Sequence, residues 1–307
     1  MDPADRSGLA EIADAWRPRP LDEADWLAAA PVAALSAVFD LPGPAARSGD
    51  ALPPLWQWLY FLSWPAQSSL GEDGHPRDGR FLPPVPRRQR MFAGGRCTID
   101  EPLRVGEPAE RRTALESVTF KQGSTGDLLF VTTRSEFRQH GRLCLVEEQD
   151  IVYRSGRSTA RHPATIDDAA AAPEPAPEDV WRLPLRTDPA LLFRISALTA
   201  NTHRIHYDAP YVRDEEGYPD VVVHGPLLAL AMLEVVRRNA SDRRVRSLTY
   251  RLRYPAFVGE RLLVCGHESG GRRPGTVGTG GDARVGAELR VASHREDRHA
   301  TASVEFA

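Results

Sequence analysis

Lysine, cysteine and long apolar runs are scarce in this chain of 307 residues. Lys121 is the one lysine among 39 basic residues, which we interpret as an arginine-favouring composition with no bearing on mechanism. Cys97, Cys144 and Cys265 are far apart and odd in number, which argues against a disulfide framework and favours a reducing compartment. No run approaches the roughly 20 apolar residues of a membrane span, and the acidic N-terminus lacks the apolar core of a secretion signal. We therefore expect a cytoplasmic protein without a membrane partner.

The charge balance and the absence of several short motifs argue against further classes of function. A formal net charge of −3 offers no basic excess for nucleic acid. The sequence has no HExxH, CxxC or EF-hand pattern, no glycine-rich loop with GK[ST], and no GxSxG elbow. Two neighbouring histidines by themselves are weak evidence for zinc. We predict neither a metal site nor a nucleic-acid partner.

A short repeat indicates that the chain consists of two related halves. Residues 102–107 read PLRVGE and residues 255–260 read PAFVGE, and each copy follows an alternating, strand-like segment. Between the copies, residues 156–179 are rich in alanine, proline and acids, a composition typical of linkers. We expect an N-terminal domain at 1–155 and a C-terminal domain at 180–307.

Alternating segments with β-branched residues predict antiparallel strands in both halves, each polar on one side. Residues 227–238 are apolar nearly all round, which predicts a buried helix with Pro226 in its first turn. Residues 53–63, PPLWQWLYFLS, predict its counterpart in the first half. Each half is then an α+β unit whose curved sheet wraps one helix, and a glycine-rich loop at 270–283 joins two strands. The strands are expected at 113–121, 127–136, 143–153, 245–254, 261–267, 285–293 and 299–306.

The densest group of chemically useful side chains lies at 201–226. It contains Asn201, His203, Arg204, His206 and Asp208, followed by His224, Gly225 and Pro226 directly before the apolar helix. An imidazole with an unperturbed pKa of about 6.5 exchanges protons at neutral pH. Backbone N–H groups at the start of a helix hold a developing oxyanion. The pattern predicts an enzyme that acts beside a carbonyl group.

The run LTANTHRIHYD, followed by EGYPDVVVHGPLLA, resembles the MaoC or hydratase-2 group of hot-dog-fold hydratases and dehydratases of acyl thioesters. Within that group the chain is most similar to the branch with two hot dogs in one chain, which includes enzymes of mesaconyl-CoA and of mitochondrial 3-hydroxyacyl thioesters. The first-half segments LPPLWQWLYFL, GEDGHPRDGRFLPPVPRRQRMFAGGR and VEEQDIVYR resemble the same branch, with no chemistry assigned to them. The resemblance implies a double hot-dog fold of the α+β class, with a degenerate first half and the active site mainly in the second.

Placed on the family's pattern, His206 falls at the catalytic histidine and Gly225 at a backbone donor of the oxyanion hole. Asn201 falls where the family has an aspartate, and an amide cannot accept a proton as a carboxylate does. The resemblance implies that His206 activates the water that adds to the β-carbon, while Asn201 holds that water or orients the ring. As alternatives, Asn201 is a turn or cap residue, and Gly225 serves only the turn before Pro226.

Four further residues of the motif are assigned to the site, and each has an alternative. Asp208 supplies the missing carboxylate, or else it caps a helix or is a solvated surface group. His203 and Arg204 bind a substrate carboxylate, as arginine does with two parallel hydrogen bonds, or else the substrate is an unbranched acyl chain without one. His224 is expected to support the entry to the helix rather than to carry a proton.

Together these observations predict a lyase that adds or removes water across the 2,3 double bond of an enoyl-CoA thioester. The substrate resembles mesaconyl-CoA or a short or medium 3-hydroxyacyl-CoA. No separate cofactor is expected, because coenzyme A is part of the substrate, and a homodimer is compatible with the fold. Two rivals stay open: a hot-dog acyl-CoA thioesterase, in which water attacks the carbonyl, and a non-catalytic acyl-CoA-binding protein.

Overall fold

The computed structural model describes residues 3–307 apart from 80, 86–87, 124–125, 156–164, 168, 172 and 271–284, and it describes the backbone alone at 3–7, 88–89, 123, 126 and 155. Almost all of the predicted loop at 270–283, and part of the predicted linker at 156–179, therefore lie outside the described residues. Within the described ranges, no helix is long and apolar enough to cross a membrane.

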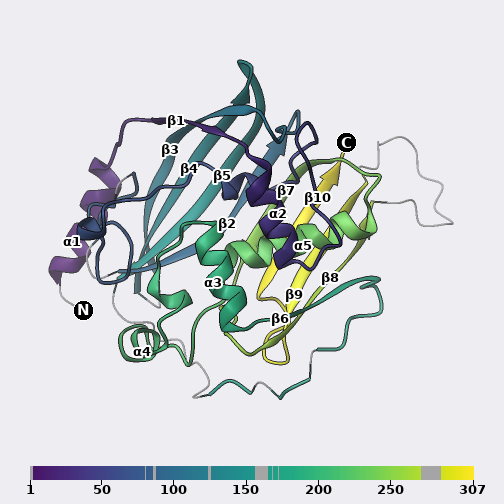
Figure 1. The fold of residues 1–307 in the computed structure, drawn as a ribbon. Coiled ribbons are helices and arrows are strands. Elements are labelled where there is room, and N and C mark those ends of the chain that lie inside the picture. The colour runs from purple at the N-terminus through teal and green to yellow at the C-terminus, as the bar shows by residue number, and fades with distance from the viewer. Residues whose placement is uncertain are drawn as a thin grey trace, which may run out of the picture.

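The described strands form one antiparallel sheet in the order β1-β3-β4-β5-β2-β7-β10-β9-β8-β6 (Figure 1). The first half supplies β1 (Leu21–Trp26), β2 (Arg88–Ile99), β3 (Pro108–Gly123), β4 (Gly126–Gln139) and β5 (Arg142–Ser155). The second half supplies β6 (Trp181–Arg186), β7 (Val245–Leu252), β8 (Arg261–Ser269), β9 (Gly286–Ala292) and β10 (Ala300–Phe306). All seven predicted strands overlap strands of this sheet. Of the other three strands, β2 contains the alternating segment noted before residues 102–107, and the short edge strands β1 and β6 were not predicted.

The strand order of the second half is the mirror image of the order of the first half. The halves meet where β2 pairs with β7, with Gly95 opposite Tyr250 and Cys97 opposite Leu248. The prediction of two separate sheets was therefore wrong. The two halves form one continuous sheet, because β2 of the first half pairs with β7 of the second. Pairing these edges satisfies backbone N–H and C=O groups that an isolated half would leave open. The α+β double hot-dog architecture itself is confirmed.

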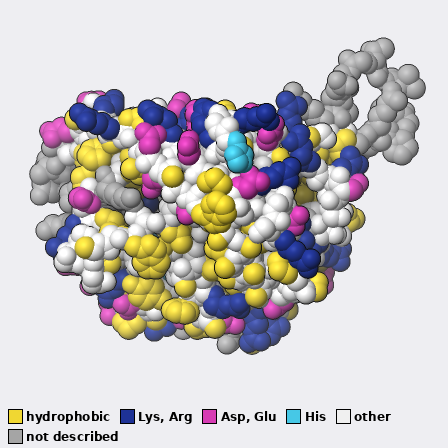
Figure 2. All heavy atoms as spheres, turned by 45° about the horizontal axis from the view of Figure 1, so that its top comes forward, with side chains coloured by type: hydrophobic (Ala, Val, Ile, Leu, Met, Phe, Trp, Pro, Cys, Tyr) yellow, Lys and Arg dark blue, Asp and Glu magenta, His cyan; other side chains and the backbone are white. Residues whose placement is uncertain are grey.

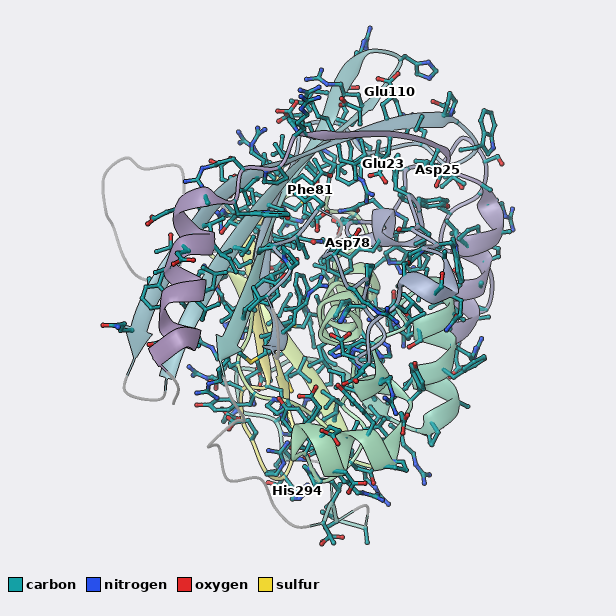
Figure 3. All side chains as sticks on the ribbon, turned by 90° about the vertical axis from the view of Figure 1, so that its left-hand side faces the viewer. Glu23, Asp25, Asp78, Phe81, Glu110 and His294 are labelled. Carbon is teal, nitrogen blue, oxygen red and sulfur yellow. The ribbon has the colours of Figure 1, made fainter. Side chains whose placement is uncertain are left out.

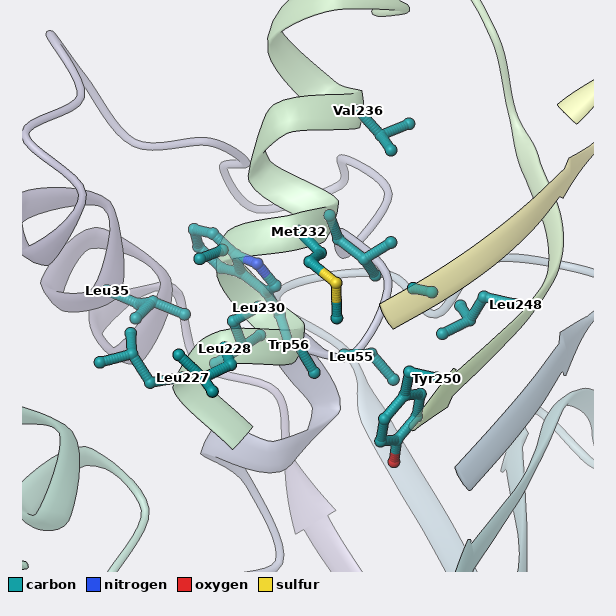
Figure 4. Packing of buried hydrophobic residues seen from close by; sticks show 14 of the residues in the cluster. Leu35, Leu55, Trp56, Leu227, Leu228, Leu230, Met232, Val236, Leu248 and Tyr250 are labelled. Atoms are coloured by element: carbon teal, nitrogen blue, oxygen red, sulfur yellow. The ribbon is translucent and has the colours of Figure 1, made fainter. Parts of the chain in front are cut away.

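Helix α5 (Gly225–Asn239) confirms the buried helix predicted at 227–238. Every residue from Leu227 to Val236 is buried, so the helix contacts apolar side chains on all sides. A fully buried leucine or valine contributes roughly 1.5–3 kcal/mol. The one acid in this stretch, Glu234, forms ion pairs with Arg237 and Arg238 in the last turn of the helix. Figure 4 shows α5 packed against Leu35, Leu55, Trp56, Leu248 and Tyr250.

The first half contains no helix equivalent to α5 at 53–63, so that prediction was wrong. The segment forms only the short 3-10 helix η1 (Trp56–Leu59). Leu55, before it, has φ +66°, and Phe61, after it, has φ +55°. Left-handed residues at both ends terminate helical hydrogen bonding. The apolar run therefore packs as core without becoming a long helix, and Trp56 and Leu59 are buried in it.

The remaining helices cover the sheet and its seam. Helix α1 (Pro3–Ala15) packs on the far end of β3 and β4, and α2 (Ala29–Val38) packs on α3 (Pro189–Leu198). Shorter elements are η2 (Gln67–Ser69), η3 (Arg204–His206), α4 (Ala209–Tyr211) and the π-helical turn η4 (Val212–Glu216). On the face shown in Figure 2, arginine and acidic side chains are interspersed among hydrophobic ones.

Candidate active site

The predicted motif begins directly after α3, in a turn that the sequence closes with local hydrogen bonds. Ala200 adopts φ +48°, and the Asn201 N–H donates to the Ser196 carbonyl over 2.9 Å. The Asn201 Oδ1 accepts from the His203 N–H over 3.0 Å, an Asx turn that leads into η3. Asn201 therefore shapes the loop through Oδ1, which is the turn alternative, and its amide nitrogen is left for any contact with water or substrate.

His206 is held in one orientation by the backbone of the facing segment. Its Nδ1 lies 2.8 Å from the Val222 carbonyl oxygen, and the Val222 N–H donates to the Ile205 carbonyl. A carbonyl only accepts, so Nδ1 carries the proton and Nε2 is the basic nitrogen of the ring. Burial lowers the pKa of His206 to about 4, and the charge of His75 acts in the same direction. The ring is therefore neutral at pH 7, the form that a general base requires.

The ring of His224 lies parallel to that of His206. Their centroids are 3.7 Å apart at an interplanar angle of 15°. His224 Nε2 lies 2.8 Å from Ser196 Oγ, and its buried Nδ1 has no hydrogen-bond partner among the described residues. Burial also lowers the pKa of His224, so two neutral rings stack without repulsion. The stack and the contact with Ser196 link α3 and the start of α5 to the loop at residues 201–208, called the catalytic loop below for its proposed role. The supporting role of His224 stays a prediction.

Gly225 is the first residue of α5, directly after the stacked His224. The N–H groups of the first helical turn have no partners within the helix and lie at its positive end. Because Pro226 has no N–H, Gly225 and Leu227 offer the donors closest to the histidines. A Cβ at Gly225 would lie 2.4 Å from Leu252 Cδ1 and 3.7 Å from Phe92 Cδ1. Only glycine fits here without a shift of Leu252, so the donor lies beside an apolar wall.

Arg204 and Asp208 are engaged with each other. Arg204 Nε and Nη2 donate to Asp208 Oδ2 over 2.9 and 2.7 Å, and the Tyr211 N–H donates to Asp208 Oδ1 over 3.1 Å. These bonds lower the pKa of Asp208. Arg204 also donates to the Glu72 carbonyl and stacks on the Tyr211 ring. This geometry favours the cap alternative for Asp208 and adds an ion pair with Arg204 that was not predicted. It leaves Arg204 poorly placed to receive a substrate carboxylate.

The structure adds two first-half residues that the sequence analysis left without chemistry, Asp73 and His75. His75 Nδ1 lies 3.1 Å from Asp73 Oδ2, and the His75 ring centroid lies 4.3 Å from that of His203. His203 in turn contacts His206 edge-on at 5.7 Å. Four imidazoles from both halves thus form one continuous group. The signal in the sequence was the polar, glycine-rich run GEDGHPRDG at 71–79, but nothing local shows which part of the protein it contacts.

The path of the first half explains how this loop reaches the second half. Between η1 and β2, the described residues 60–79 and 81–85 lie outside the sheet, in an excursion of the chain. The labelled Asp78 and Phe81 mark this excursion near the middle of Figure 3. Its far end is held where Trp16 Nε1 of the N-terminal segment donates to the Phe81 carbonyl over 3.3 Å. This excursion directly follows η1, which stands where a long first-half helix was predicted.

A cavity of about 400 Å³ lies at the other end of α5. Residues 51–57 of the first half and 233–245 of the second half provide most of its lining, which includes none of the four histidines. The cavity is therefore separate from the imidazole group.

Comparison with known proteins agrees with this picture. Residues 55–258 match the family "Hydroxyacyl-thioester dehydratase type 2". The chain is 44% identical over 243 residues to Mesaconyl-C(4)-CoA hydratase of Chloroflexus aurantiacus, covering 79% of this chain and 84% of that protein. It is 26% identical over 248 residues to the mitochondrial hydroxyacyl-thioester dehydratase type 2 of Schizosaccharomyces pombe, covering 72% and 79%.

A solved structure from Mycobacterium tuberculosis, described as a double hotdog fold, superposes with a TM-score of 0.53 at 14% identity over 95% of this chain and 96% of that one. This likeness concerns the fold alone. The family match and the 44% identity agree with the resemblance predicted from the 201–229 motif. This chain therefore belongs to the hydroxyacyl-thioester dehydratase type 2 family, enzymes of the acyl-thioester hydratase and dehydratase class.

Proposed function

We propose that this protein catalyses the reversible addition of water across the 2,3 double bond of an acyl-CoA thioester. The observation that carries the proposal is the stack of His206 on His224, because it brings a neutral imidazole base to the first N–H group of α5. A base and an oxyanion donor side by side are what an addition to a conjugated thioester requires.

In the proposed hydration, His206 Nε2 takes a proton from water while the water oxygen bonds to C3. The C2=C3 electron pair moves toward C1, and negative charge collects on the thioester oxygen. The N–H groups at the start of α5 stabilise that charge, an effect of roughly 3–4 kcal/mol for one well-placed donor. When the charge returns, C2 takes up a proton. Dehydration is the same sequence in reverse.

Asn201 supports this step as a positioning residue. Its Oδ1 holds the His203 N–H and so fixes the loop that carries His206. We assign its amide N–H to the attacking water, the role given to it from the sequence. Phe92 and Leu252, next to Gly225, are the side chains against which the acyl group would lie.

For the substrate we propose a coenzyme A thioester, with coenzyme A as carrier and no further cofactor. The name of the Chloroflexus relative makes mesaconyl-C4-CoA the first compound to test. Cys97, Cys144 and Cys265 are buried free thiols, which fits the proposed cytoplasmic location. A homodimer remains part of the proposal.

The test is a side-by-side assay of crotonyl-, mesaconyl- and itaconyl-CoA with the full-length protein. A hydratase changes the enoyl absorbance of at least one of them and releases no thiol that reacts with a chromogenic reagent. Release of free coenzyme A instead would establish a thioesterase. Tight binding without turnover of any compound would establish a binding protein, and either result would overturn the proposal.

A further inference from the structure

Asp73 and His75 form a carboxylate–imidazole pair inside the group of four histidines. Asp73 Oδ2 lies 3.1 Å from His75 Nδ1, with side chains 21% and 17% exposed respectively. The second oxygen of the same carboxylate, Asp73 Oδ1, accepts a hydrogen bond from the His75 N–H over 2.9 Å. A carboxylate at Nδ1 fixes the tautomer and the orientation of a ring, and it stabilises the imidazolium that forms when Nε2 takes a proton.

The pair is anchored to the catalytic loop by backbone contacts. The Arg204 N–H donates to the Asp73 carbonyl over 2.9 Å, and Thr202 Oγ1 donates to the Gly74 carbonyl over 2.6 Å. Gly74 has φ +88°, and a Cβ there would lie 1.9 Å from the Thr202 carbonyl oxygen. The two loops are so close that Gly74 can carry no side chain. The dyad is therefore a fixed part of the second half's site, although the first half supplies it.

The proposed reaction needs a second proton position besides His206. The base takes its proton from water on one carbon, and C2 must receive a proton on the adjacent carbon. His206 has only Nε2 available, since Nδ1 is committed to Val222. Asn201 is an amide and does not titrate, and the Asp208 carboxylate is held by Arg204 and Tyr211. Of the four histidines in this group, His75 is the one paired with a carboxylate, that of Asp73.

Resting on the function proposed above, we propose that His75, held by Asp73, is the second proton carrier of this active site, donating the proton that C2 receives in hydration and taking it back in dehydration. His203 lies between the two carriers, with ring centroids 4.3 Å from His75 and 5.7 Å from His206. Burial lowers the pKa of His203, and the charges of His75 and His206 act in the same direction, so this ring is neutral at pH 7.

The cycle balances without any further reactant. Water loses one proton to His206 Nε2 as the C3–O bond forms, and the C2=C3 π pair becomes the C2–H bond with the proton from His75. The proton on His206 then returns to His75 by way of His203 or solvent. Both rings end as they began, and the net change is one water added to the thioester.

The charged and titratable groups around the dyad belong to several elements. In the second half they are His203, Arg204, His206 and Asp208 of the catalytic loop, Tyr211 of α4 and His224 before α5. In the first half the group is Arg90 of β2. A carboxylate and two imidazoles whose donor atoms lie within 4.8 Å of one another also resemble a metal-ligand set. A bound metal would hold the same nitrogens that the proposal uses for proton transfer, so the test must separate the two.

The experiment compares the full-length wild type with His75→Gln, Asp73→Asn and the matched control His140→Gln. His140 is also paired with a carboxylate, Glu107 at 2.8 Å, but on the exposed turn between β4 and β5. We expect kcat to fall about 10²–10³-fold in His75→Gln and about 10-fold in Asp73→Asn, with KM within about threefold, and no change in the control. The fall of kcat at high pH, where the acid has lost its proton, should disappear in His75→Gln. Incorporation of deuterium at C2 in heavy water should slow by the same factor as kcat.

The outcomes distinguish this proposal from the function on which it rests. If the wild type turns over no enoyl thioester, the proposed function fails and the dyad fails with it. If the wild type is active and His75→Gln matches it in kcat and pH profile, only the dyad proposal fails. The dyad proposal also fails if His75→Gln lowers kcat and the melting temperature together while the pH profile of kcat keeps its shape. A stoichiometric metal in the purified protein, with activity lost on chelation, would make the cluster a metal site instead.

Discussion

The two halves of the molecule share one backbone frame, but the proposed base and the proposed oxyanion donor both lie in the second half. In both, an edge strand leads into a ten-residue helix, α2 or α3. At the helix end, the Leu41 N–H donates to the Ser36 carbonyl, as the Asn201 N–H donates to that of Ser196. The residues before these, Asp40 and Ala200, have φ +51° and +48°. Equivalent hydrogen bonds and left-handed turns at a constant spacing show that the halves superpose here residue by residue.

The same equivalence shows what the first half has lost. With this spacing Leu41 stands for Asn201 and Ala46 for His206. The isolated β-bridges Ala51–Arg104 and Val222–Phe257 also occupy equivalent places in the two halves. Counting three residues on from Ala51 and from Val222 aligns Pro54 with Gly225.

A proline nitrogen carries no hydrogen, so the first half has neither the base nor the oxyanion donor. Equivalent backbone hydrogen bonds thus occur in both halves, whereas the side chains at the proposed catalytic positions differ. The cavity lined by residues 51–57 lies beside this part of the first half and reaches the C-terminal end of α5.

Removing the proposed base of the second half should lower kcat more than any other change. His206→Ala gives the second half the residue that Ala46 provides in the first, and we expect kcat to fall about 10³–10⁴-fold. The measurement is the initial rate of enoyl absorbance change, together with a thermal melt that shows the fold is intact. Activity close to that of the wild type would remove His206 from the mechanism.

Copying Pro54 into the second half tests the oxyanion donor. Because any Cβ at Gly225 would collide with Leu252, the comparison is made in a Leu252→Ala background, between Gly225→Ala, which keeps the N–H, and Gly225→Pro, which loses it. His224 has φ −58° and ψ 124°, a conformation compatible with a following proline. We expect kcat of the proline variant to be about 10²–10³-fold below that of the alanine variant. Equal rates would mean that Gly225 serves only the turn.

The buried histidines of the second half should make the protein sensitive to acid. The folded-state pKa of His206 is about 4, below its unfolded value, so the unfolded chain binds a proton first as the pH falls. The free energy of unfolding therefore decreases between about pH 6.5 and 4, by up to about 3 kcal/mol for this one residue. Above that window the ring contributes no such penalty.

Urea unfolding of the wild type and of His206→Gln at pH 7.5, 6 and 5 measures this effect. The loss of stability on acidification should be smaller in the variant. The exposed His140→Gln serves as the first-half control and should follow the wild type. Parallel pH dependence in His206→Gln and the wild type would contradict the lowered pKa.

The smallest effect is expected at Asp208. If its carboxylate only caps α4 and pairs with Arg204, then Asp208→Asn keeps a capping side chain and loses a partly exposed ion pair, at a cost of about 0.5–1 kcal/mol. Its kcat should stay within about threefold of the wild type. A loss of about 100-fold or more with unchanged stability would restore Asp208 as the missing carboxylate.

Local patterns predicted the parts of the fold that are determined locally. Alternation identified the long strands, and an apolar run after Pro226 identified α5. The short edge strand β1, LDEADW, was not predicted because half of its residues are acids and its pairing with β3 is not local. The first-half helix was wrong because the left-handed Leu55 and Phe61 interrupt a run that looks helical by composition.

For the site, the motif at 201–225 predicted roles for His206 and Gly225, and the structure places both beside His224. The contacts of Asp208 could not be predicted, because they depend on where Arg204 points. Asp73 and His75 could not be placed, because their contact with Thr202 and Arg204 spans more than a hundred residues of sequence. The contact between these two loops depends on how the strands of the sheet are paired, and a local sequence pattern does not predict that pairing.

The contact between the Gly74 turn and Thr202 makes the second half depend on the first. A C-terminal fragment that begins at residue 180 would keep the whole 201–225 motif but would lose the turn at residues 73–75 that packs against it. The two halves are therefore expected to work only when they are present together.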